Sequence, residues 1–172
     1  MIKIAITGPE CSGKTTLAIA LGQEFDISWI PEFSRVYLSK LDRSYKQEDL
    51  DVIAQKQQNA IDLIERIGKG KYLITDTEMT VMKIWSQEKY QDVSETITTL
   101  WQQQSYDLYL LCKPDIPYEN DPLRENPDDR DRLYEIYKAE LISKGVHFVE
   151  IEGLEFQRKA KALKAIEDLN SN

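Results

Sequence analysis

Short apolar runs and longer segments of helical periodicity alternate along the chain. The apolar runs occupy residues 2–6, 27–31, 72–75, 107–112 and 147–151. Runs of this length without polar alternation are typical of strands that are buried on both faces of a sheet. Between these runs, apolar residues recur every three or four positions, which predicts helices with one buried face.

The predicted helices begin near residues 14, 49, 79, 92, 128 and 156. Gly68 ends the long second helix, Asp128 can cap the fifth, and Gly145 ends it. Alternating strands and helices predict a mainly parallel sheet that helices cover on both faces. In such a fold the ligand binds at the carboxyl ends of the strands.

The composition is that of one enzyme-sized domain. The chain has 172 residues, of which 41% are hydrophobic and 30% are charged, and this predicts a soluble globular protein. We expect it in the cytoplasm, because no apolar run approaches the ~20 residues that cross a bilayer and no signal peptide precedes the first strand. The net charge of −8 argues against nucleic-acid binding, which needs a basic face.

Residues 8–16, GPECSGKTT, match a P-loop between a strand and a helix. The glycines let backbone amides approach phosphate oxygens, and the helix N-terminus adds its dipole. Lys14 reaches the outer phosphates, and the Thr15 hydroxyl is a ligand of the bridging Mg²⁺. We therefore expect ATP and Mg²⁺ at this loop, contacted by Gly8, Glu10, Cys11, Ser12, Gly13, Lys14, Thr15 and Thr16.

Asp76 ends the strand at 72–75 and matches the carboxylate that holds Mg²⁺ beside a P-loop. Together with the strand and helix pattern, this predicts an α/β P-loop NTPase fold. We expect five mainly parallel strands in the order 2-3-1-4-5, helices on both faces, and a single domain over residues 1–172.

An acceptor group is predicted after the second strand, at Glu32 and Arg35. Glu32 can accept a proton from a hydroxyl near the γ-phosphate, and Arg35 can steady phosphate or substrate. The alternative is a surface ion pair at a helix start. Tyr37 can form an apolar wall, and Trp85 can stack on a cationic ring or simply belong to the core.

An arginine-bearing lid is predicted at about residues 113–132, a proline-bounded segment without periodicity. Positive charges that close over phosphates supply much of the catalysis in phosphoryl transfer. Arg124 and Arg130 are the candidates for this role. Arg132 is expected to pair with neighbouring aspartates instead.

Three stretches carry a family resemblance: PEFSRVYL, LITDTEMTVMKIW, and YDLYLLCKPDIPYENDPLREN with the following DDRDRLYEIY. They resemble the ribosylnicotinamide kinase domain of NadR-type proteins, an AAA_28-like P-loop NTPase. The resemblance implies transfer of the γ-phosphate of ATP to the 5′-hydroxyl of nicotinamide riboside, which gives nicotinamide mononucleotide. It covers the kinase domain alone, so it implies neither the nucleotidyltransferase nor the DNA-binding activity of longer relatives.

The resemblance also implies site residues. The phosphate loop corresponds to residues 8–16, the magnesium carboxylate to Asp76, the acceptor group to Glu32 and Arg35, and the lid arginine to Arg124. Where the family often has a second Asp, this chain has Glu78, which adds a substrate-binding candidate. Glu32, Asp76 and Glu78 are thus three candidate bases, of which Glu32 is freest if Asp76 holds magnesium.

Three functions remain open from the sequence. The first is a nicotinamide riboside kinase, and the second is a kinase for another nucleoside or small coenzyme precursor, because a P-loop does not determine the substrate. The third is a nucleotide-gated regulatory ATPase without an acceptor. The group at Glu32 and Arg35 favours the first two.

Overall fold

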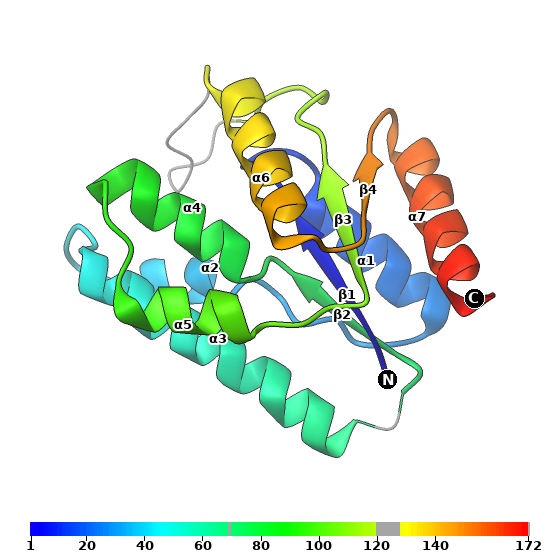
Figure 1. Cartoon of the computed structure of the whole chain (residues 1–172), viewed down its shortest axis with the longest axis horizontal. Coiled ribbons are helices and arrows are strands. Elements are labelled where there is room, and N and C mark those ends of the chain that lie inside the picture. The colour runs from blue at the N-terminus through cyan, green and yellow to red at the C-terminus, as the bar shows by residue number, and fades with distance from the viewer. Residues whose placement is uncertain (69, 120–127, 172) are drawn as a thin grey trace.

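Parallel strands form the centre of the molecule in the computed structural model, which describes residues 1–68, 70–119 and 128–171 (Figure 1). Within these residues the sheet has four strands in the order β2-β1-β3-β4. The strands are β1 (Ile2–Thr7), β2 (Tyr72–Asp76), β3 (Leu108–Cys112) and β4 (Phe148–Ile151). Every neighbouring pair is parallel, so the carboxyl ends of all strands lie at one edge.

The predicted second strand is absent from this sheet, which corrects the expected number of five. Of residues 27–31, Ile30 alone forms an isolated parallel bridge, with Thr75 of β2. Glu32 is already the N-cap of α2 (Phe33–Leu38), so the chain turns away after one bridging residue. The bridge still lies beside β2, and the predicted order of the other four strands is confirmed.

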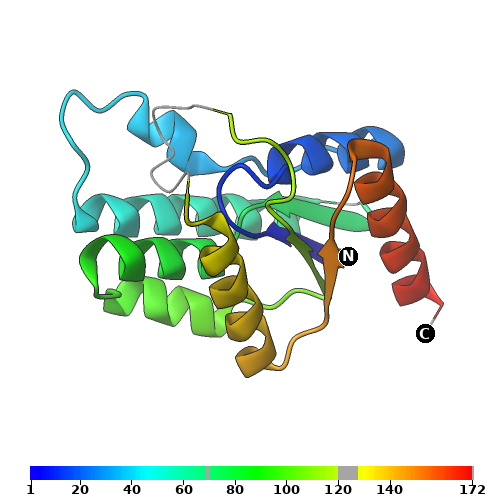
Figure 2. The same cartoon turned by 90° about the horizontal axis from the view of Figure 1, so that it is seen from above.

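Helices cover both faces of the sheet (Figure 2). One face carries α1 (Lys14–Phe25) and α7 (Glu155–Asn170), which pack on the side of Ile4 and Ile6. The other face carries α3 (Gln47–Ile67), α4 (Met79–Tyr90), α5 (Glu95–Gln103) and α6 (Arg130–Lys144). Because side chains alternate along a strand, β1 supplies buried residues to both layers.

The helix ends follow the predicted signals closely. Gly68 is the C-cap of α3, and Gly145 ends α6 with a φ of 65° that suits glycine. The predicted cap of α6 is wrong by one residue, because Asp129 takes the N-cap position and its carboxylate pairs with Arg132. Within the described residues, no helix is both long enough and apolar enough to cross a membrane.

Candidate active site

A cleft of about 290 Å³ opens beside the loop that follows β1. Residues 8–16, the start of α2 and one side of α4 all contribute to its lining. Further described residues from the segment after β3 and from α6 complete the lining. The cleft therefore lies at the carboxyl edge of the sheet, where the parallel topology predicts a ligand.

The glycines of the phosphate loop are required by its path. Gly8 has a φ of 130°, and a Cβ at this position would lie only 2.6 Å from the carbonyl oxygen of Cys112. Gly13 has a φ of 79° and is the N-cap of α1. These conformations bring the loop against the end of β3 and turn it directly into the helix.

Lys14 lines the cleft, as predicted, and its ammonium group contacts the loop itself. Nζ donates to the carbonyl oxygens of Gly8 at 3.0 Å and of Pro9 at 2.7 Å. A phosphate in the cleft would offer stronger, charged acceptors to the same ammonium group. The other predicted loop residues that line the cleft are Gly8, Glu10, Cys11, Ser12, Gly13, Thr15 and Thr16.

Thr15, which lines the cleft, contacts Asp76, which lies outside the lining. The Thr15 hydroxyl donates to Oδ2 of Asp76 at 2.7 Å. Oδ1 of Asp76 is buried and has no hydrogen-bond partner among the described residues. Burial raises the pKa of Asp76, while the Thr15 hydrogen bond opposes that rise.

These two side chains fit a magnesium ion. A hydroxyl, a carboxylate and phosphate oxygens are the ligands that Mg²⁺ takes in phosphoryl-transfer sites, where few protein ligands are needed. The unpaired Oδ1 supplies an acceptor that no described side chain or backbone group uses.

Glu32 and Arg35 line the same cleft as the phosphate loop. The Glu32 carboxylate accepts a hydrogen bond from the Ser34 hydroxyl at 2.6 Å, and Nε of Arg35 lies 3.9 Å from its other oxygen. Glu32 raises and Arg35 lowers the pKa of Asp76, which reflects their closeness to it. Both residues of the predicted acceptor group therefore line the cleft. The ion pair between Glu32 and Arg35, which was the alternative interpretation, is present there as a long contact.

Of the two predicted aromatic residues, only Trp85 lines the cleft. Its Nε1 donates to the hydroxyl of Tyr45 at 3.0 Å, and the two rings meet edge to face at 5.3 Å. Tyr37 is directed elsewhere, because its hydroxyl donates to Oδ1 of Asp49 at 2.8 Å. The structure therefore leaves Tyr37 outside the cleft lining.

Glu78 lies outside the cleft lining as well. It is 1% exposed and accepts hydrogen bonds from the Thr7 hydroxyl at 2.7 Å, the Thr80 amide at 2.7 Å and the Gln104 side chain at 2.6 Å. These bonds cap α4 and tie it to the end of β1. Glu32 is the one of the three candidate bases whose side chain lines the cleft.

The predicted lid lies partly outside the described residues, and Arg124 is one of the residues outside them. Arg130 donates through Nη1 to the carbonyl oxygens of Cys11 at 3.0 Å and Ile116 at 3.1 Å. Its guanidinium thus contacts the phosphate loop from the carbonyl side. Arg132 pairs with Glu88 and Asp129, in line with its expected role.

Sequence reasoning missed several residues of the site. Glu88 and Lys89 line the cleft one helical turn after Trp85, a spacing that could have identified them. Arg158 of α7 contacts the phosphate loop at the Ser12 carbonyl, 146 positions away in sequence. No local pattern around Arg158 marks this contact.

Comparisons with solved structures identify the same fold in two NadR structures and in a thymidylate kinase. A NadR protein in complex with NR matches with a TM-score of 0.84 and 19% identity, over 99% of this chain and 52% of that chain. A NadR protein in complex with NAD and AMP-PNP matches with a TM-score of 0.80 and 18% identity, over 98% and 49%. Thymidylate kinase from Candida albicans matches with a TM-score of 0.71 and 14% identity, over 97% and 91%.

Among curated proteins, tRNA dimethylallyltransferase 2 of Phocaeicola vulgatus is 28% identical over 142 residues, which is 80% of this chain and 43% of that protein. The chain thus spans about half the length of the NadR structures and less than half of this relative. The resemblance to NadR-type proteins is confirmed at the level of the fold. A family model described as an AAA domain, AAA_28, matches residues 3–159, so this chain belongs to the AAA_28 family.

Proposed function

We propose that this protein is a kinase that transfers the γ-phosphate of ATP to the 5′-hydroxyl of nicotinamide riboside. The observation that carries the proposal is that Lys14 and Glu32 line the same cleft. A phosphate donor and a hydroxyl acceptor need such an arrangement, with a cation on the donor side and a proton acceptor on the other.

The donor side is supported by the phosphate loop. Its backbone amides and Lys14 would bind the β- and γ-phosphates of ATP. Thr15 and Asp76 would hold Mg²⁺, which neutralises charge on the same phosphates when bound. The NadR structure that contains AMP-PNP shares this fold, which supports ATP as the donor.

The acceptor side is supported by the groups facing the loop. Glu32 would accept the proton of the attacking hydroxyl, while Arg35 and the Ser34 hydroxyl hold the carboxylate in place. Trp85 offers an aromatic surface, and Glu88, whose carboxylate pairs with Arg132, lines the cleft one helical turn further on. Such surroundings suit the cationic ring of nicotinamide riboside, and a NadR protein binds NR in the similar structure.

A second candidate is a kinase for another nucleoside or nucleotide. The similarity to thymidylate kinase, which extends over 97% of this chain, favours it. The relative that is named for tRNA suggests a different acceptor, but the net charge of −8 opposes binding of a polyanion.

A coupled assay tests these alternatives. The protein is incubated with ATP and Mg²⁺ and with nicotinamide riboside, adenosine, cytidine or water as acceptor. ADP formation and the phosphorylated product are followed, with Lys14→Met as the inactive control. We expect transfer to nicotinamide riboside. Transfer to another nucleoside would support the second candidate, and slow transfer to water alone would support a regulatory ATPase.

A further inference from the structure

We propose that Arg158 is a positioning residue that orients the Ser12–Gly13 peptide of the phosphate loop for binding of the nucleotide phosphates. The role rests on the proposed function, because it assumes a polyphosphate in the cleft. Arg158 does not line the cleft itself, so it acts through the backbone of the loop.

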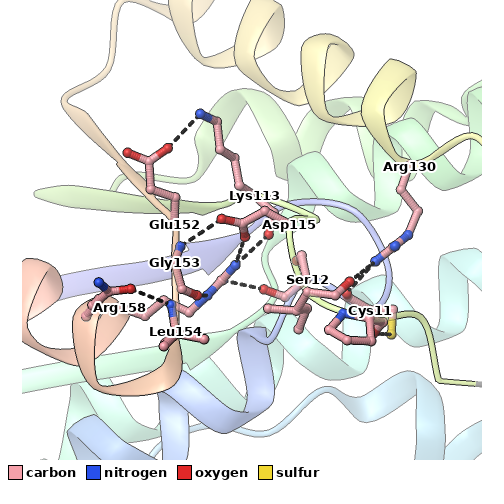
Figure 3. A network of polar contacts seen from close by, with 12 residues as sticks. Cys11, Ser12, Lys113, Asp115, Arg130, Glu152, Gly153, Leu154 and Arg158 are labelled. Atoms are coloured by element: carbon pink, nitrogen blue, oxygen red, sulfur yellow. Dashed lines mark hydrogen bonds and ion pairs between the residues drawn. The ribbon is translucent and has the colours of Figure 1, made fainter.

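The guanidinium of Arg158 is almost fully engaged with backbone groups (Figure 3). Arg158 is 4% exposed, and its Nη1 donates to the carbonyl oxygen of Ser12 at 2.8 Å. Its Nε donates to the Gly153 carbonyl at 2.7 Å, and Nη2 donates to the Lys113 carbonyl at 2.9 Å. One side chain thus joins the phosphate loop to the segments that follow β3 and β4.

The contact at Ser12 determines the direction of the next amide. In a planar trans peptide the carbonyl oxygen and the following N–H point in opposite directions. Holding the Ser12 oxygen toward α7 therefore directs the Gly13 N–H away from α7. Gly13 lines the cleft, so this direction serves an anion bound there.

Gly13 needs an external constraint of this kind. Because glycine has no Cβ, it can adopt the observed φ of 79° but also many other values. The sterics of Gly13 alone therefore do not determine the orientation of the preceding peptide. Nη1 of Arg158 would lie 3.6 Å from a Cβ at Gly13, which shows how closely the guanidinium packs on this peptide. The hydrogen bond replaces the missing steric restraint.

A second arginine holds the preceding peptide in the same way (Figure 3). Arg130 of α6 donates to the Cys11 carbonyl at 3.0 Å, which directs the Ser12 N–H away from that arginine. Two helices on different faces of the sheet thus constrain consecutive peptides of the loop. At these two peptides the arginines bind the carbonyl side, which leaves the N–H side for phosphate.

Asp115 holds Arg158 in place. Its carboxylate forms an ion pair with Nη2 of Arg158, and its other oxygen accepts the Gly153 amide at 2.7 Å. A buried guanidinium needs such a partner, because an uncompensated charge in this position would be costly. Asp115 therefore helps to position Arg158, although its own side chain is 38% exposed.

The test uses Arg158→Met and measures binding of inorganic tripolyphosphate by calorimetry, because this probe reports the loop without a base or an acceptor. We expect the Kd to rise about tenfold or more, the usual weight of a hydrogen bond to a charged group. The KM for ATP should rise in parallel, while the KM for the acceptor stays unchanged. Lys159→Met is the matched control, since Lys159 follows on α7 and pairs with Glu24 at 2.8 Å, and its Kd should stay within about twofold of the wild type.

A second variant keeps the test decisive if Arg158→Met does not fold. Asp115→Asn removes the charge that holds Arg158 and should raise the tripolyphosphate Kd about threefold or more, whereas Asp168→Asn at the far end of α7 should not. Folded variants that bind tripolyphosphate as the wild type does would overturn the role of Arg158. A wild-type protein that binds no tripolyphosphate would overturn the proposed kinase function instead.

Discussion

The hydroxyl of Thr15 donates a 2.7 Å hydrogen bond to Oδ2 of Asp76, which joins the first turn of α1 to the end of β2. The second carboxylate oxygen of Asp76 is buried without a hydrogen-bond partner among the described residues. A carboxylate in this position is less well solvated than in the unfolded chain, so its charge destabilises the fold until a cation binds. The two side chains proposed to hold Mg²⁺ are therefore already in contact with each other.

We expect Asp76→Asn to separate activity from stability. Burial raises the pKa of Asp76, so the folded state binds more protons than the unfolded state near this pKa. Wild-type stability should therefore fall relative to the variant as the pH rises from about 4 through the raised pKa. Urea unfolding at several pH values checks this.

The same variant should lose phosphoryl transfer by about 100-fold or more, since a proposed ligand of the Mg²⁺ that neutralises the transferred phosphate is gone. Asp62→Asn is the control, because Asp62 lies on α3 and bonds only Gln58 in the described contacts. A stability difference that is constant with pH would contradict the raised pKa of Asp76.

Glu32→Gln should lower kcat by about 100-fold to 10,000-fold, because the general base is removed from the acceptor wall. ATP binding should remain nearly intact, since Lys14 and the loop amides are unchanged. Single-turnover kinetics and ATP titration measure the two effects. Glu24→Gln, on the outer side of α1, serves as the control. Normal turnover in the Glu32 variant would exclude Glu32 from the chemistry.

The donor side of the site could be read from the sequence because its signals are local. Residues 8–16 carry their own turn chemistry and helix start, and Asp76 follows a clear apolar run. The structure brings Thr15 and Asp76 together across 61 positions, as the paired motifs predict. Strand order followed from the same reasoning, apart from the edge segment that forms only one bridge.

The rest of the site depends on tertiary partners that no local pattern reveals. Tyr37 turns to Asp49, and Glu78 turns to Gln104, so neither lines the cleft despite its position beside an apparent motif. Arg158 reaches Ser12 only because α7 packs against α1. A long polar side chain can reach several partners that are distant in sequence, and sequence spacing does not indicate which of them it contacts.

Glu78→Gln tests the structural position of that carboxylate. The amide can no longer accept from all of Thr7, Thr80 and Gln104, so we expect a loss of about 1–3 kcal/mol in the free energy of unfolding. The KM for the acceptor should not change in the folded variant. Urea unfolding and initial-rate kinetics measure both, with Glu95→Gln on α5 as the control. A raised KM for the acceptor without a loss in the free energy of unfolding would show that Glu78 contributes to substrate binding after all.

The Asp49 carboxylate should make the free energy of unfolding depend on pH in the acidic range. The Arg43 guanidinium, the Lys46 amide and the Tyr37 hydroxyl all donate to this carboxylate, and together they hold its pKa well below the ordinary 3.8. A depressed pKa means that the stabilisation is complete above about pH 4 and is lost as the pH falls toward the folded-state pKa.

Asp49→Asn should therefore reduce the free energy of unfolding by about 2 kcal/mol at pH 7, and the difference from the wild type should narrow below pH 4. Chemical denaturation across this range measures it. Glu48→Gln is the neighbouring control, because Glu48 is exposed on the same turn of α3. A difference that persists unchanged in acid would show that the carboxylate charge is not involved.

Gly8→Ala should show how tightly the phosphate loop is held against β3. The new Cβ would lie 2.6 Å from the Cys112 carbonyl oxygen, and the φ of 130° is unfavourable for alanine. We expect a loss of about 3 kcal/mol or more, because backbone atoms cannot yield as a flexible side chain can.

Gly145→Ala supplies the matched control for that substitution. Gly145 also has a positive φ, of 65°, but a Cβ there would meet nothing within 4 Å. Gly145→Ala should therefore lower the free energy of unfolding by about 1 kcal/mol, because alanine is unfavourable at this positive φ. The difference between the two variants, measured by urea unfolding, reports the close approach of the loop to β3 together with the less favourable φ at position 8. Equal losses would mean that this approach contributes nothing to stability, and that glycine is kept at position 8 by its conformation alone.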